Sequence, residues 1–183
     1  MALTETNITQ LLVLCQQGNQ LAQLEVYSRY QNAMYNVALR IVKDTAEAED
    51  VMQEGFITAF SKLDTFKGTA TFGAWLKRIV INKSISKYHS NQKTVSLEDS
   101  MIADEGEEAL SGSEAPPIAT DAHRVMSCME ELHESYRQIL TLHFIEGYDY
   151  EEICKIMQIS YANCRTLVSR AKQSLRKQLS KAS

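Results

Sequence analysis

The chain has 183 residues, 44% of them hydrophobic and 23% charged, and its formal net charge at pH 7 is −4. These values are ordinary for a globular protein and leave room for one medium domain or two small ones. The sequence contains no run of about eighteen apolar residues that could span a bilayer, and its start lacks the basic and small-residue pattern of a secretory signal, so we expect a cytoplasmic protein.

The spacing of apolar residues predicts an all-α fold. Only seven glycines and two prolines interrupt the chain, and apolar residues recur at three- and four-residue steps over long stretches. The pattern predicts four helices in the first half of the chain, over about residues 8–17, 21–42, 44–63 and 72–89. The residues of the second helix expected to face inward are Leu24, Tyr27, Ala38 and Ile41.

The third predicted helix begins with acidic residues. Asp44 followed by Glu47 is a capping-box pattern, and Glu49, Asp50 and Glu54 follow in the first turns. Carboxylates at these positions stabilise the positive end of the helix dipole. Helix capping and solubility therefore account for them on the sequence alone.

The fourth predicted helix lies in a window without acidic residues. Between Asp64 and Glu98 the chain carries six Lys or Arg residues, interleaved with Phe66, Phe72 and Trp75. Cations bind the phosphates of unpaired nucleic acid while its bases stack on aromatic rings. The window therefore favours a polyanion as partner, and the alternative is a solvated basic face with Trp75 in the core.

Residues 94–120 are predicted to form a flexible acidic linker between two helical domains. Residues 94–121 carry eight acidic and no basic residues, whereas the segments before and after carry ten basic against eight acidic and nine basic against seven acidic. Ser, Gly, Pro and Glu replace periodic apolar residues in this segment. The two domains are expected at residues 1–93 and 121–183.

Four more helices are predicted after the linker, over about residues 124–132, 136–146, 150–157 and 161–179. The last two, joined by a tight turn, form a helix-turn-helix. The apolar stripe of the last helix consists of Cys164, Val168, Ala171, Leu175 and Leu179. Cations on its other faces can meet a DNA major groove and its flanking phosphates.

No catalytic, metal or cofactor site is expected. The four cysteines form no Cys-x-x-Cys pair, so we expect small core or half-buried thiols. The four histidines are scattered, without a nucleophile, a metal cluster or a phosphate-binding glycine loop beside them. The chain is therefore not expected to be an enzyme.

Three segments, in order, resemble those of a known family. AEAEDVMQEGFITAF resembles region 2.2 of bacterial RNA polymerase sigma factors, FKGTATFGAWLKRIVIN resembles regions 2.3 and 2.4, and YDYEEICKIMQIS followed by RTLVSRAKQSLRK resembles region 4.2. The chain thus resembles the extracytoplasmic-function (ECF, group IV) sigma factors, which keep only the second and fourth conserved domains. The resemblance implies an alternative sigma factor that binds core RNA polymerase, directs it to specific promoters and helps to melt DNA.

The resemblance also implies roles for individual residues. The clamp helices of the largest polymerase subunit would contact Glu49, Asp50, Gln53 and Glu54, and the flap region is a further expected contact. The first domain would bind the minus-ten element, with a flipped base near Phe66 and Asn82, through Phe66, Lys67, Trp75, Arg78, Asn82, Lys83 and Lys87. The second domain would bind the minus-thirty-five element through Arg165, Thr166, Leu167, Arg170 and Lys172, although Leu167 stands where the family commonly has Arg. An anti-sigma factor is a further implied partner, and no membrane insertion is expected.

Two other functions stay open on the sequence alone. A conventional helix-turn-helix repressor or activator would use the second half, but it leaves the basic aromatic window and the acidic third helix without a role. A helical protein-interaction adaptor would use the acidic faces and bind no nucleic acid. Transcription directed by the chain, with core polymerase and a promoter library, separates the three.

Overall fold

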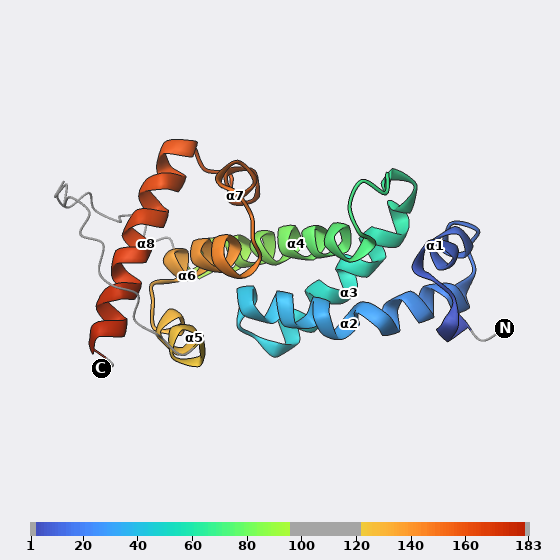
Figure 1. Ribbon diagram of the computed structural model, residues 1–183, viewed down its shortest axis with the longest axis horizontal. Coiled ribbons are helices and arrows are strands. Elements are labelled where there is room, and N and C mark those ends of the chain that lie inside the picture. The colour runs from blue at the N-terminus through green and yellow to red at the C-terminus, as the bar shows by residue number, and fades with distance from the viewer. Residues whose placement is uncertain (1–2, 96–121, 182–183) are drawn as a thin grey trace. The chain divides into compact units, whose positions relative to one another are not determined.

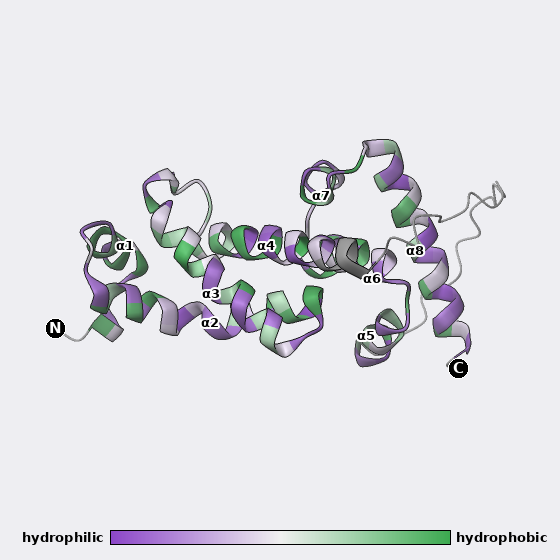
Figure 2. Cartoon of the chain, turned by 180° about the vertical axis from the view of Figure 1, so that it is seen from behind, coloured by the Kyte–Doolittle hydropathy of each residue, from purple (hydrophilic) through white to green (hydrophobic). Residues whose placement is uncertain are grey.

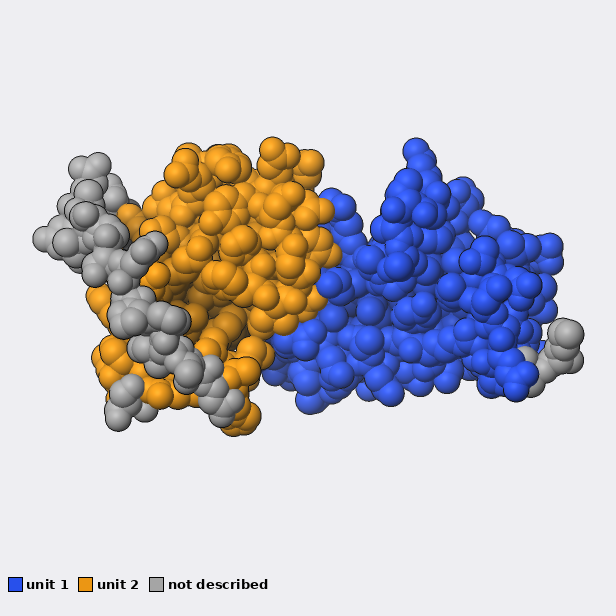
Figure 3. Space-filling model, viewed as in Figure 1, with its two compact units in different colours: residues 1–95 blue, residues 96–183 orange. Residues whose placement is uncertain are grey.

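The computed structural model describes residues 3–95 and 122–181, with side chains described up to residue 90 and again from residue 122. Within these ranges every regular element is a helix, as the apolar spacing predicts (Figure 1). The chain divides into two compact units, residues 1–95 and 96–183 (Figure 3). Most of the predicted acidic linker lies outside the described residues.

The first unit is a bundle of long helices. Its helices are α1 (Ile8–Gln16), α2 (Gln20–Val42), α3 (Thr45–Ser61) and α4 (Phe72–Val95), with 3₁₀ turns η1 (Leu3–Glu5) and η2 (Leu63–Thr65). Helices α2, α3 and α4 pack against one another, and α1 packs on α2. Because α4 continues to Val95, the helix extends beyond the predicted domain end at residue 93.

Local capping explains where these helices begin and end. The side chain of Asn19 accepts a hydrogen bond from the Ala22 amide at 3.0 Å, and that of Asp44 accepts one from the Glu47 amide at 2.9 Å. Each satisfies an amide that has no partner inside its helix. Gly18, at φ +79°, follows α1 in the left-handed conformation that ends a helix.

One expectation for the inner face of α2 is wrong. Ala38 and Ile41 are buried, at 0% and 1% exposure, and Tyr27 is half-buried, but Leu24 is 63% exposed. The buried face at this end of α2 is formed by Ala22 and Val26. Leu24 lies about 200° around the helix from Ala22 and therefore faces solvent.

Helices α3 and α4 are in tight contact at Gly55. A Cβ atom on Gly55 would lie 2.7 Å from Val80 Cγ2, which is closer than carbon atoms pack. Both residues are in the core, with Val80 fully buried. The absence of a side chain at residue 55 thus sets the separation of the two helices that carry the predicted first-domain sites.

The second unit is built from short helices that pack against one long helix. Its elements are α5 (Ala122–Glu130), α6 (Glu134–Leu140), a π-helical segment η3 (Thr141–Ile145), α7 (Tyr150–Met157) and α8 (Tyr161–Lys181). The single helix predicted over residues 136–146 is therefore α6 continued by a π-helical turn. Ile139, Leu140 and Leu142 are fully buried, so this stretch forms the centre of the unit's core.

The predicted helix-turn-helix is present in α7 and α8 (Figure 1). Asp149 and Glu152 form a capping box at the start of α7, in which each side chain accepts a hydrogen bond from the other's backbone amide. Gln158, at φ +56°, ends α7 in the left-handed conformation. Among the described helices, none is long and apolar enough to cross a membrane.

Candidate nucleic-acid and protein interfaces

Helix α3 separates a buried face from an exposed polar one. Its buried residues are Ala48, Val51, Met52, Gly55, Phe56 and Ala59. The four residues predicted to meet a polymerase, here called the α3 row, are all exposed: Glu49, Asp50, Gln53 and Glu54. Gln53 Nε2 donates a hydrogen bond to Glu49 Oε1 at 3.3 Å. The α3 row therefore offers polar groups to a partner without taking part in the core.

Ile57 belongs to the same face, and the sequence reasoning missed it. Its side chain is 69% exposed, and on a helical wheel it lies within about 60° of Asp50, Gln53 and Glu54. The spacing of four residues from Gln53 was the available signal. Ile57 follows the α3 row along the helix, and an exposed aliphatic residue beside charged groups is typical of a protein contact surface.

An aromatic cluster joins the loop before α4 to the helix itself. The ring centroids of Phe66 and Trp75 are 5.3 Å apart, those of Phe66 and Phe72 5.8 Å, and those of Tyr30 and Phe72 5.4 Å. Phe72 is buried, whereas Phe66 and Trp75 are half-buried. Trp75 therefore packs against Phe66 and Phe72 and also presents part of its ring to solvent, and its contact with nucleic acid stays a prediction.

The residues predicted to bind the minus-ten element do not share one face of α4. Trp75, Arg78 and Asn82 fall within an arc of about 60°, and Arg78 and Asn82 are exposed. Lys83 and Lys87 are half-buried and lie about 100° and 140° from Asn82. Lys67 is exposed in the loop before the helix. We call Trp75, Arg78 and Asn82 the solvent-facing arc of α4, and Lys83 and Lys87 the flank of α4.

The flank of α4 meets the α3 row through an ion pair. Lys83 Nζ lies 3.3 Å from Glu54 Oε2, and the two side chains are 30% and 65% exposed. One residue predicted to bind DNA is thereby in contact with one predicted to bind protein.

The face of α8 that carries cations is only partly free of internal contacts. Arg165, Thr166 and Arg170 are exposed, as expected for residues that reach DNA. Lys172 is half-buried, with its Nζ atom 5.2 Å from the centroid of the Phe144 ring. This cation–π contact holds the Lys172 ammonium against the π-helical segment. Figure 2 shows hydrophilic and hydrophobic residues alternating along α8.

Leu167 lies at the border of the core. Cys164, Val168 and Ala171 of the predicted stripe are buried, which confirms the register of α8, whereas Leu175 and Leu179 at its far end are only half-buried. Leu167 is half-buried and lies about 100° from both Thr166 and Val168. Its side chain therefore lies at the boundary between the buried side of α8, which includes Val168, and the exposed side, which includes Thr166.

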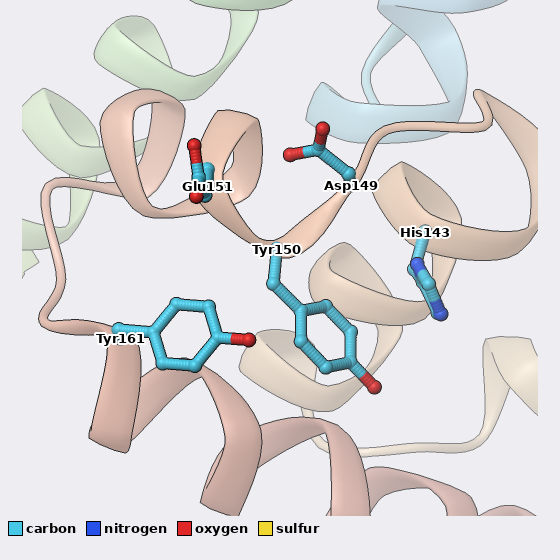
Figure 4. A pocket seen from close by; sticks show the side chains of 5 residues that line it. All are labelled: His143, Asp149, Tyr150, Glu151 and Tyr161. Carbon is cyan, nitrogen blue, oxygen red and sulfur yellow. The ribbon is translucent and has the colours of Figure 1, made fainter.

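A shallow cavity of about 390 Å³ opens between the start of α7 and the start of α8 (Figure 4). It is lined by His143, Asp149, Tyr150, Glu151 and Tyr161. The Tyr150 ring centroid is 5.0 Å from that of His143 and 6.2 Å from that of Tyr161. Tyr161 is 52% exposed at the first position of α8, so it is a surface residue of the helix-turn-helix that the pattern reasoning missed.

The cysteines are core or half-buried thiols, as predicted. Cys15, Cys128 and Cys164 are buried, and Cys154 is half-buried. Burial raises the pKa of Cys164 to about 11, with a further contribution from the neighbouring Cys154 thiol. A thiol with so high a pKa is neutral near pH 7 and a poor nucleophile.

Comparisons with known proteins identify both units. The family model for Sigma-70 region 2 matches residues 26–94, and that for Sigma-70, region 4 matches residues 122–175. The chain is 32% identical over 186 residues to the RNA polymerase sigma-H factor of Pseudomonas aeruginosa, covering 97% of this chain and 96% of the relative. It is 30% identical over 153 residues to the ECF RNA polymerase sigma factor SigM of Bacillus subtilis, covering 83% of this chain and 91% of the relative.

Solved structures share the fold. The sigma factor RpoE of Bartonella quintana, in complex with the anti-sigma factor NepR, has a TM-score of 0.54 at 22% identity, covering 85% of this chain and 95% of that one. CnrH, in complex with the cytosolic domain of CnrY, has a TM-score of 0.53 at 23% identity, covering 94% of this chain and 97% of that one.

Proposed function

This chain belongs to the extracytoplasmic-function (ECF) group of the sigma-70 family of RNA polymerase sigma factors, and we propose which surfaces of its two units bind which partner. The first unit binds core polymerase and the minus-ten element, and the second unit binds the minus-thirty-five element. As a sigma factor it binds core RNA polymerase, directs it to specific promoters and helps to melt DNA for initiation. It is not an enzyme, because nucleotide polymerisation belongs to the core polymerase. We propose that it works in the cytoplasm, and that an anti-sigma factor controls it, as one binds RpoE of Bartonella quintana.

The core polymerase contact is proposed for the exposed face of α3. The α3 row supplies three carboxylates and an amide, and the exposed side chain of Ile57 follows them on the same helix face. Carboxylates steer a basic partner into place, and the desolvated aliphatic group contributes to the affinity. The proposal rests on one observation: α3 exposes carboxylates and an aliphatic side chain on one face, while α4 and α8 of the same chain expose cations suited to nucleic acid.

The minus-ten element is proposed to bind the solvent-facing arc of α4, the adjoining loop and, through the half-buried Lys83, the flank of α4. Extruding a base from a duplex costs a few kcal/mol of stacking, which a pocket offsets by stacking and by hydrogen bonds to the base edge. Phe66 and Trp75 offer half-exposed rings, and Asn82 offers an exposed amide that can donate and accept. Lys67 and Arg78 are exposed cations suited to the phosphates of the melted strand.

The minus-thirty-five element is proposed to bind α8 of the helix-turn-helix. Arg165 and Arg170 can reach guanine edges or phosphates, and Thr166 lies between them on the exposed arc. Lys172, held against Phe144, would contribute mainly through its charge. The proposal therefore gives base reading to the first three residues and a weaker, electrostatic role to Lys172.

Reconstituted transcription tests this proposal. The chain, mixed with core polymerase and a promoter library, should yield transcripts that core polymerase alone does not. Asp50→Ala with Gln53→Ala should lower the affinity for core polymerase, whereas Glu5→Gln, which changes an exposed acid of the same unit outside the α3 row, should not.

Asn82→Ala should keep core binding but lower the rate of promoter melting, measured as permanganate reactivity of unpaired thymines. Arg165→Ala with Arg170→Ala should lower the affinity for the minus-thirty-five element and leave core binding unchanged. A chain that binds duplex DNA tightly without core polymerase, or that binds no nucleic acid at all, would overturn the proposal in favour of a repressor or an adaptor.

A further inference from the structure

The ion pair between Glu54 and Lys83 stands where two proposed binding surfaces meet. Glu54 belongs to the α3 row, and Lys83 belongs to the flank of α4, with Nζ and Oε2 3.3 Å apart. Glu54 is adjacent in sequence to Gly55, and Lys83 lies one turn after Val80. Because the missing side chain at Gly55 lets α3 and α4 approach there, the backbones of the two charged residues are held at a distance that their side chains bridge.

We infer that this ion pair couples the two surfaces, so that in the free protein each charged group weakens the other's attraction for its own partner. The inference rests on the proposed function, in which Glu54 faces core polymerase and Lys83 faces DNA. A basic group approaching Glu54 meets the field of the nearby Lys83 ammonium. A phosphate approaching Lys83 meets the field of the Glu54 carboxylate in the same way.

The coupling has a defined sign. A cation of core polymerase that neutralises Glu54 removes a negative charge from beside Lys83, and the Lys83 ammonium then attracts a phosphate more strongly. By thermodynamic linkage, core binding raises the affinity for the melted strand, and the strand raises the affinity for core polymerase by the same factor. The contact thus disfavours DNA binding by the free protein.

The expected size follows from the exposure of the pair. Both side chains reach solvent, at 30% and 65% exposure, and exposed ion pairs shift an equilibrium by about 1.4- to 5-fold. Salt screens charges at the surface, so the factor should shrink as the ionic strength rises. The device adjusts binding by a small factor and does not block it.

The affinity of the full chain for core polymerase tests the coupling, because the coupling predicts that removing a cation tightens binding. Lys83→Ala should tighten binding to core polymerase by about 1.4- to 5-fold, because it removes the cation beside Glu54. Lys62→Ala removes an exposed cation of the same unit that is outside both surfaces, and should leave the affinity unchanged. In a Glu54→Gln background, Lys83→Ala should have no effect, since the coupling has already been removed. Fluorescence anisotropy of the labelled chain, titrated with core polymerase at low salt, measures the affinity of the three single variants and of the double variant.

The outcomes separate this inference from the proposed function. If Asp50→Ala with Gln53→Ala and Glu54→Gln all leave core affinity unchanged, the proposed polymerase surface is wrong. If those changes weaken core binding but Lys83→Ala behaves like Lys62→Ala, or weakens binding, the coupling is overturned while the surface stands. As a second readout, Glu54→Gln should raise the affinity of the free chain for a single-stranded minus-ten oligonucleotide, and an affinity equal to that of the unmodified chain would also overturn the coupling.

Discussion

Gly55→Ala should destabilise the first unit, because α3 and α4 have no room for a methyl group where Gly55 faces Val80. The new Cβ would lie 2.7 Å from Cγ2 of Val80, a fully buried residue whose branched side chain has little rotamer freedom. Overpacking of this kind costs about 1–3 kcal/mol, and replacing glycine within a helix returns about 1 kcal/mol. Because the clash is with a stiff, fully buried side chain, we expect an overpacking cost in the upper part of that range, about 2–3 kcal/mol. The net loss in the free energy of unfolding should then be about 1–2 kcal/mol.

The chain carries its own probe for this measurement. Trp75 is the single tryptophan and lies in the first unit, so urea unfolding followed by its fluorescence reports on that unit. Val80→Ala removes the clashing atom, and the double variant should lose less stability than the sum of the two single variants. A Gly55→Ala protein as stable as the unmodified chain would show that α3 and α4 are farther apart than described.

Three further changes test the proposed surfaces and the core of the second unit. Ile57→Ser should weaken core binding several-fold in a titration with labelled chain while changing stability by less than about 0.5 kcal/mol, because the side chain is 69% exposed; unchanged affinity would remove Ile57 from the interface. Leu167→Arg should steepen the salt dependence of holoenzyme binding to the upstream element by about one unit of slope, and parallel salt curves would show that residue 167 does not reach DNA. Because burial raises the Cys164 pKa from 9.0 to about 11, the unfolded state loses this proton first and stability should fall as pH rises from 9 towards 11; Cys164→Val should lose less over that range in urea unfolding followed by circular dichroism, and equal losses in both proteins would contradict the shift.

The sequence was sufficient for the features that depend on neighbouring residues. Asp44 caps α3, and Gly18 and Gly147 follow helices in left-handed conformations, because capping needs only a side chain or a glycine at one position. The stripe of α8 was also predictable, since it repeats every three or four residues. The π-helical turn after α6 and the outward position of Leu24 were not, because both depend on which neighbouring helices surround the segment.

The candidate surfaces were predictable as helix faces but not as contacts. Charge and spacing predicted that the acidic residues of α3 and the cations of α8 lie on polar helix faces. The choice of the α3 row and of individual α8 residues as partner surfaces came from the family resemblance. Ile57 and Tyr161 were missed because an aliphatic or aromatic residue in an amphipathic helix is usually assigned to the core, and only the packed structure leaves these two at 69% and 52% exposure.

The two lysines whose surroundings differ most from the expectation share a physical cause. Lys83 and Lys172 each lie at the edge of an exposed arc, next to another element of their own unit, and a long flexible side chain at such an edge can reach a group across the gap. Lys83 reaches the carboxylate of Glu54, and Lys172 reaches the ring of Phe144. Exposed contacts of this kind are worth about 1 kcal/mol or less, so DNA can compete for either lysine. Arg165, on the exposed surface of α8, has a planar guanidinium that makes two parallel hydrogen bonds, which favours it over Lys172 as a reader of bases. Replacing Lys172 should therefore weaken binding to all sequences alike, whereas replacing Arg165 should change which sequences are bound.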